Sequence, residues 1–394
     1  MSLKQIRLEQ RRKVEKCELQ IRQILLYAGV YPVENPHKLY RCLWWFVIFV
    51  FTFNFMGMII LIIHHRKNLS IVLGGAGVAL SLMTVITKGT CCIWYDKEMA
   101  LIKKHLSGMM DRNMSASQEI WDTMIQPMLY YVSRIYLFIY TLGFALVLVM
   151  FSKPALIMLS QVIRGHNITY IRPYPTIYFW KIPPGGPIYM MHYFIDTACS
   201  WYVVSIGISV DNLFAYSTAI IMAHYRALNY EIRQFNGIDI EKMKEFVCRH
   251  QELNDVCQYL GVLNGPVILI IAVSTSLILC SNIFTFSKME TITLSQAAWP
   301  AVYTAYKLLQ VFIFAWCGEL LKETSEEFRE AVYASRWHKH DNKKVAYCVR
   351  MMMNQKPILL NACGVKPVTA DLFSGVANTA VSYFFLMQTI SEKD

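Results

Sequence analysis

Charged side chains are scarce in this chain of 394 residues. Asp, Glu, Lys and Arg make up 16% of it, against roughly 25% in ordinary soluble domains. Hydrophobic residues make up 55%, and the mean hydropathy is +0.34. So little charge cannot cover two or three soluble domains, and so apolar a chain is not intrinsically disordered. The composition therefore indicates a membrane protein.

Catalytic motifs are also missing. The chain has no Walker loop, G-x-G-x-x-G, H-E-x-x-H, C-x-x-C or G-x-S-x-G motif, so enzyme chemistry has no anchor and we expect no cofactor. We expect no metal site either, because Cys91 and Cys92 are adjacent and His64-His65 stands at the end of an apolar run. None of the eleven cysteines lies in a predicted outer loop, which argues against an outer disulfide. Internal repeats, from which many transporters are built, are absent as well.

Long apolar runs dominate what is present. A transmembrane helix needs about 20 mostly apolar residues, and six runs qualify: Leu43 to Ile63, Ile71 to Trp94, Leu129 to Phe151, Ile188 to Met222, Val262 to Ser287 and Ala297 to Gly318. A seventh run, Thr369 to Ile390, carries polar residues that suit water or a partner helix better than lipid: Asp371, Ser374, Asn378, Thr379 and Ser382. We therefore expect an all-α membrane protein with seven transmembrane helices.

Basic residues alternate between the two sides of these spans. Of the 38 Lys and Arg residues, 27 lie in one alternating set of loops and 8 in the other. By the positive-inside rule, the N-terminus is cytoplasmic and the C-terminus extracellular. The net charge of +11 thus reflects membrane topology, and we expect no nucleic-acid partner. The first forty residues contain no apolar stretch typical of a cleavable signal peptide.

Two segments outside the spans carry a pattern of their own. The outer loop from Ser152 to Pro187 holds six of the thirteen prolines, and we interpret it as a lid or vestibule wall. It contains Asn167, the one credible glycosylation site among three sequons.

On the cytosolic side, apolar residues between Ile240 and Leu260 recur at three- and four-residue spacing. This pattern predicts an amphipathic helix running into the fifth span, as part of a cytosolic bundle or along the membrane surface.

Ionisable groups inside the spans are functional candidates, because charge in lipid is costly. Lys88 stands near a predicted cytosolic end, where snorkelling explains it. Lys307 lies in the middle of the sixth span, and we hypothesise that it pairs with Asp196 or Asp211 of the fourth. A structural ion pair and a solvated cavity residue are the alternatives.

Aromatic residues gather in the outer halves of the spans. Several share a helix face at three- or four-residue spacing, with few charges among them. Such a set suits a small, mostly apolar ligand with one or two polar atoms, and packing is the alternative. The predicted ligand-binding residues are Met83, Tyr136, Tyr140, Phe144, Tyr193, Trp201, Tyr303 and Tyr306.

The last sixty residues carry the most specific motifs. An element Ala-x-Tyr-x-Ser-x-Trp ends at Trp337, and Gln355-Lys356-Pro357-x-x-Leu360-x-Ala362-x-Gly364 follows it. Together with Phe373 and Ser382-Tyr383-Phe384-x-Leu386, these motifs resemble the C-terminal signature of the insect odorant receptor family. Where the family has Thr-Ala-Gly-Gly, this chain has Asn361-Ala362-Cys363-Gly364, so the hinge before the last span is expected to differ. The chain also lacks the long second cytosolic loop of the family's co-receptor and so looks like an odour-tuning subunit.

The resemblance implies a non-selective cation channel opened directly by a volatile odorant and formed as a heterotetramer with the co-receptor, in the cell membrane of olfactory neuron dendrites. It implies that the seventh helix lines a central pore, with gate and pore residues Leu386, Gln388, Thr389 and Ile390. It further implies subunit contacts at Tyr333, Trp337, Phe373 and Tyr383. Permeating cations and membrane lipid would be the remaining partners.

The expected organisation is one domain, residues 1–394. Residues 1–42 form a cytosolic segment, 43–318 a six-helix ligand-binding part, 319–368 a cytosolic anchor, and 369–394 the pore helix with its outer tail. Two other chemoreceptor classes remain as alternatives. A G-protein-coupled receptor would have the opposite orientation, whereas a gustatory-type channel would share this topology but carry a different C-terminal signature.

Overall fold

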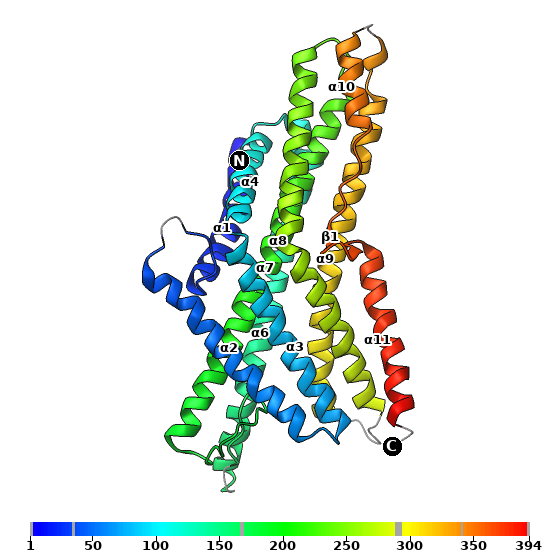
Figure 1. Cartoon of the computed structure of the whole chain (residues 1–394). Helices are drawn as coiled ribbons and strands as arrows, with labels where there is room; N and C mark the ends of the chain where they lie inside the picture. The colour runs from blue at the N-terminus through cyan, green and yellow to red at the C-terminus, as the bar shows by residue number, and fades with distance from the viewer. Residues whose placement is uncertain (1–2, 34–35, 166–168, 288–293, 340–341, 392–394) are drawn as a thin grey trace.

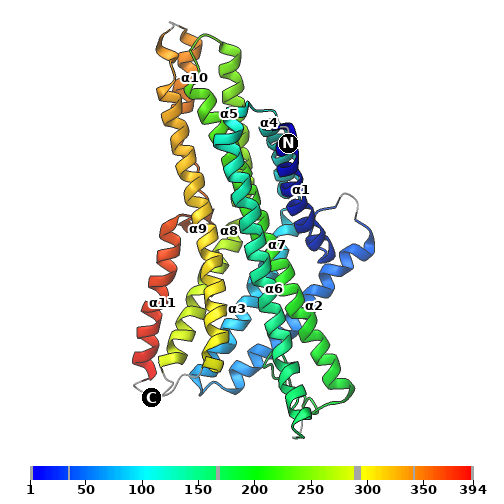
Figure 2. The ribbon, with the colours of Figure 1, turned by 180° about the vertical axis from the view of Figure 1, so that it is seen from behind.

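The computed structural model describes residues 3–33, 36–165, 169–287, 294–339 and 342–391. These residues form an elongated bundle of helices (Figures 1 and 2). The helices before the outer lid are α1 (Leu3–Tyr27), α2 (Lys38–His64), α3 (Leu69–Trp94), α4 (Asp96–Met114), α5 (Gln118–Ile120), the π-helical turn η1 (Trp121–Ile125) and α6 (Gln126–Ile163). After it come α7 (Gly186–Arg233), α8 (Ile240–Ser287), α9 (Leu294–Ala334), the 3-10 turn η2 (Trp337–Lys339), α10 (Lys343–Met353) and α11 (Ala370–Ser391).

All seven predicted spans are helical. The first six lie in α2, α3, α6, α7, α8 and α9, and the described part of the chain has six helices long and apolar enough to cross a membrane by length and composition. The seventh run forms α11, which is shorter and carries polar residues along its length. The third span continues beyond its predicted end, because α6 runs on through Pro154 to Ile163.

Two helices are far longer than a membrane is thick. α7 and α8 have 48 residues each, so each is about 72 Å long at 1.5 Å per residue, against a hydrocarbon core of roughly 30 Å. Figure 1 shows them extending from the membrane bundle to the end where α10 lies. The predicted amphipathic helix that runs into the fifth span is therefore confirmed as the first half of α8.

α7 is the central helix of the molecule. Nearly all its side chains from Ile206 to Ile232 are buried, because α1, α4, α6 and α9 pack around it. α11, in contrast, packs only on one side, against α8 and α9. Its buried face consists of Leu372, Val376 and Ala380.

A short hairpin precedes α11 and was not foreseen from the sequence. Strand β1 (Asn361–Ala362) pairs antiparallel with β2 (Lys366–Pro367). The turn between them places Cys363 at φ 53° and Gly364 at φ 73°. Left-handed backbone of this kind favours glycine, and Cys363 adopts it at the position where the sequence departs from the family pattern.

α9 meets the start of α11 through backbone. A Cβ atom on Gly318 would lie 2.1 Å from the carbonyl oxygen of Val368, so only glycine allows this approach. One residue later, the Glu319 Oε2 atom accepts a hydrogen bond of 3.0 Å from the Ala370 backbone N–H at the first residue of α11. Residues 318–319 of α9 therefore contact residues 368–370 at the start of α11.

This close approach predicts the behaviour of two glycine variants. Gly318→Ala forces the backbone of Val368 away, at a cost of about 1–3 kcal/mol, and we expect a lower apparent Tm for the purified chain in detergent. Gly108→Ala in α4 is the matched control, since a Cβ there meets nothing within 4 Å and alanine favours helix by about 1 kcal/mol. Equal Tm values for the two variants would show that the contact at Gly318 does not matter.

Candidate functional site

The membrane bundle contains a cavity of about 490 Å³. Its walls come from α3, α6, α7, α8 and α9, and the outer lid closes one end through residues 171–175. The lining is mainly apolar, with Val78, Leu82, Leu146, Val204 and Ile278 among its side chains. Cavities of this size and composition hold small organic molecules.

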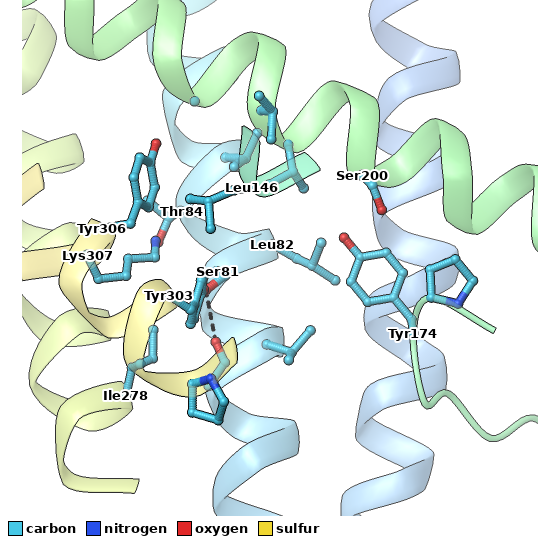
Figure 3. A pocket seen from close by; sticks show the side chains of 18 of the residues that line it. Ser81, Leu82, Thr84, Leu146, Tyr174, Ser200, Ile278, Tyr303, Tyr306 and Lys307 are labelled. Carbon is cyan, nitrogen blue, oxygen red and sulfur yellow. Dashed lines mark hydrogen bonds between the residues drawn. The ribbon is translucent and has the colours of Figure 1, made fainter. Parts of the chain in front are cut away.

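Polar side chains from α3, α7, α8, α9 and the lid also line the cavity. In Figure 3, Tyr303 of α9 lies beside Ser81 of α3, and their hydroxyl groups share a hydrogen bond. Tyr306 lies one turn further along α9, beside Lys307. From the lid, Tyr174 points its hydroxyl toward Ser200 of α7. Burial raises the pKa of Tyr174 well above its ordinary value, so this phenol remains protonated and can donate a hydrogen bond.

A buried carboxylate organises the inner end of the cavity. Asp211 of α7 accepts a hydrogen bond of 2.6 Å from the Lys88 ammonium of α3 and one of 2.5 Å from the Gln310 amide of α9. Lys88 also donates to the Gly207 carbonyl at 2.9 Å. The side chains of Lys88 and Asp211 are 1% and 5% exposed, so this ion pair is buried, and with Gln310 it ties three helices together.

Two expectations about charge are wrong as a consequence. Lys88 does not snorkel to the membrane surface, because Asp211 pairs with it inside the bundle. Lys307 does not pair with either aspartate, since Lys88 has taken Asp211 and Arg172 lies 3.7 Å from Asp196. The Lys307 Nζ atom lies instead over the Tyr303 ring, 5.9 Å from its centroid.

An aromatic cluster holds the lid at the outer end. Tyr178 stacks between Phe53 of α2 and Trp180, with ring centroids 4.8 and 5.1 Å apart. The Trp180 indole donates a hydrogen bond of 3.2 Å to His192 of α7. The Ile177 backbone N–H donates to the Gly57 carbonyl of α2 at 3.2 Å. The lid is therefore anchored to two helices, as the interpretation of this loop as a vestibule wall requires.

The structure does not bring the eight predicted ligand residues together. Tyr303 and Tyr306 line the cavity. A separate groove of about 330 Å³, bordered by α1, α6 and α7, contains Tyr140, Phe144 and Trp201.

The remaining three predicted residues lie elsewhere. Met83 points away from the cavity between Leu82 and Thr84, which line it. Tyr136 donates a hydrogen bond to Gln20 of α1 at 3.0 Å. Tyr193 packs against Tyr189, whose hydroxyl group donates to the Ile171 carbonyl of the lid at 2.9 Å.

Several cavity residues were missed, although one signal was present in the sequence. Small and polar residues recur at helical spacing along the second span and all face the cavity: Gly74, Gly77, Ser81, Thr84 and Lys88. Such a stripe in an apolar run indicates a face turned away from lipid. The contribution of Tyr174 carried no such signal, because nothing in a proline-rich loop predicts which residue folds inward.

The predicted pore residues stand on the open side of α11. Leu386, Gln388 and Thr389 are exposed in the single chain, as are Asp371, Ser374, Asn378, Thr379 and Ser382. The Ile390 side chain and Asn167 lie outside the described residues. Of the predicted subunit contacts, Tyr333 and Tyr383 are exposed, whereas Trp337 and Phe373 are half-buried within the chain. Phe373 packs edge-on against Phe312 of α9, with centroids 5.7 Å apart.

Comparisons with known proteins agree with this architecture. The family model described as 7tm Odorant receptor matches residues 68–381. Odorant receptor 47a of Drosophila melanogaster is 24% identical over 244 residues, which are 59% of this chain and 62% of that protein. The Odorant receptor coreceptor of Anopheles gambiae is 25% identical over 146 residues, which are 37% of this chain and 30% of that protein. The matched stretches thus span less than two thirds of these relatives.

A solved structure shares the fold over the whole chain. The olfactory receptor OR5 from Machilis hrabei, solved in complex with eugenol, superposes with a TM-score of 0.79 and covers 98% of this chain and 99% of its own at 12% identity. The family resemblance predicted from the C-terminal motifs is confirmed, since the matching model covers well over half of the chain. The chain is a multi-pass membrane protein that belongs to the insect odorant receptor family.

Proposed function

We propose that this chain is an odour-tuning subunit of a ligand-gated, non-selective cation channel. One observation carries the proposal: a mainly apolar cavity lies in the same bundle as a helix, α11, whose polar face is left uncovered. The cavity accommodates the odorant, and the uncovered face of α11 lines the pore of an assembled channel. Odorant binding biases the pore toward its open state.

The cavity suits a small volatile molecule. Its volume of about 490 Å³ falls within the range of ligand sites, roughly 300–1,000 Å³. Apolar burial supplies most of the affinity, and the hydroxyl group of Tyr306, which lines the cavity, is placed to orient one polar atom. The receptor that shares this fold was solved with eugenol, a small aromatic molecule of that kind.

The second subunit of the channel is the family's co-receptor. Similarity to the Odorant receptor coreceptor of Anopheles gambiae over 37% of the chain supports a common architecture for the two. The exposed Tyr333 and Tyr383 side chains supply aromatic contacts between subunits of the kind that interfaces favour. Four subunits then place α11 around one central pore, with the anchor of residues 319–368 on the cytosolic side, in the dendrite membrane of an olfactory neuron.

A recording from whole cells tests this function. Cells that express the chain together with the co-receptor are expected to pass a fast cation current during puffs of odorant, with G-protein signalling blocked. Cells that express the chain alone serve as the control. A current that disappears under the block would assign the chain to G-protein coupling instead.

Tyr306 and Tyr140 form a matched pair for locating the ligand. Tyr306→Ala removes an aromatic wall of the cavity, so we expect the odorant EC50 to rise about tenfold, which corresponds to about 1.4 kcal/mol of binding free energy. Tyr140→Ala changes the separate groove at α1, α6 and α7 and should leave the EC50 unchanged. The opposite ranking would move the ligand site to that groove.

Leu386 is expected to act as part of the gate. Apolar rings in a narrow pore block ions by excluding water, and Leu386 stands exposed near the outer end of α11. Leu386→Ser should therefore raise the current in the absence of odorant. Val381→Ser, at an exposed apolar position on the same helix, is the control. If neither variant passes current in the absence of odorant, the gate lies elsewhere.

A further inference from the structure

The inner end of the cavity holds more positive than negative charge. Lys88 and Lys307 both line it, and Asp211 is the carboxylate beside them. Asp211 already accepts a hydrogen bond on each oxygen atom, from Lys88 and from Gln310. In the part of the chain that the structure describes, the second lysine, Lys307, makes no ion pair of its own.

Lys307 is also buried and directed into the empty space. Only 5% of the residue is exposed, and Figure 3 shows its side chain reaching from α9 toward Thr84 of α3 across the cavity. Among the described residues, it makes no hydrogen bond or ion pair. In the described residues, the Thr84 hydroxyl group makes hydrogen bonds with the Leu80 carbonyl and the Ser274 hydroxyl group and none with Lys307.

The chemistry of an ammonium defines what would satisfy it. A lysine side chain offers three donors and no acceptor, so its partner must bring an acceptor. Burial disfavours the charged form of such a lysine unless an anion pairs with it, and a bound carboxylate supplies that pairing where a neutral carbonyl group does not. A ligand amine is disfavoured, because Lys88 and Lys307 both repel it. The remainder of the cavity, lined by Val78, Leu82 and Ile278, accepts hydrocarbon.

We propose that the cavity selects a carboxylic acid, whose carboxylate pairs with Lys307 and whose aliphatic or aromatic body fills the apolar part. This inference rests on the proposed function only for its consequence, the opening of a channel. The binding step stands on the cavity and its uncompensated lysine alone. The proposal predicts that the cavity binds a carboxylic acid more tightly than the methyl ester of the same chain length.

Direct binding tests the pairing. The full chain, purified with the co-receptor in lipid nanodiscs, is incubated with radiolabelled octanoic acid, and unlabelled octanoic acid and methyl octanoate compete for the site. We expect the acid to compete at least tenfold better than the ester with the wild-type chain. Lys307→Met should abolish that preference while the ester still binds, and Lys307→Arg, which keeps the charge, should retain it.

Two further variants keep the result interpretable. Lys181→Met removes an exposed lysine of the outer loop and should leave the preference intact, as a control for general surface charge. If Lys307→Met loses the ester as well as the acid, its fold is damaged, and Lys307→Gln takes its place. Equal competition by acid and ester with the wild-type chain, or an acid preference that survives in Lys307→Gln, overturns the proposal.

Current recordings separate this inference from the proposed function. Acid-selective binding without any odorant-evoked current would leave the acid site standing and refute the channel. Currents evoked by neutral odorants, combined with no preference for the acid in binding, would refute the acid site and leave the channel standing.

Discussion

The Asp211 carboxylate is the point on which the membrane bundle depends. A charge inside a bundle is tolerated only when it is paired and hydrogen-bonded, and Asp211 of α7 meets this condition by holding Lys88 of α3 and Gln310 of α9 at once. Loss of Lys88 leaves the Asp211 carboxylate buried without its ion-pair partner. The pairing therefore fixes the axial positions of α3, α7 and α9 relative to one another. The shape of the neighbouring cavity depends on those positions.

α9 connects this region to the helix that we assign to the pore. Its segment from Tyr303 to Gln310 lines the cavity, and within the next three turns it contacts the start of α11. Phe312 packs against Phe373, Gly318 touches the Val368 backbone, and Glu319 accepts from Ala370. A shift of α9 thus carries the start of α11 with it, because the contact between Gly318 and Val368 joins backbone to backbone and no side-chain rotation can relieve it.

The helices could be predicted from the sequence, whereas the contacts between helices could not, and the reason is physical. Hydrophobic runs and three- and four-residue spacing report which residues form a helix and which share a face, and this was enough for the spans and for α8. Spacing does not report which helix covers that face: Tyr136 and Tyr140 stack with centroids 5.9 Å apart, yet α1 covers Tyr136 and turns it from the cavity. The burial of Lys88 could likewise not be predicted from spacing, because its ion-pair partner, Asp211, is 123 residues away in the sequence.

A ligand opens a channel only by the difference between its affinities for the open and closed states. Contacts with cavity walls that do not move between the two states raise the affinities for the open and closed states equally. Such contacts do not change the fraction of open channels. α8 and α9 differ from the other walls, because both line the cavity and contact α11. Ser276 of α8 donates to the Val376 carbonyl, and Glu319 and Phe312 of α9 contact the first turn. A group that binds Tyr306 or Lys307 acts on α9 directly. We therefore expect efficacy to follow contacts with α8 and α9, whereas contacts with α6 and the lid contribute affinity alone.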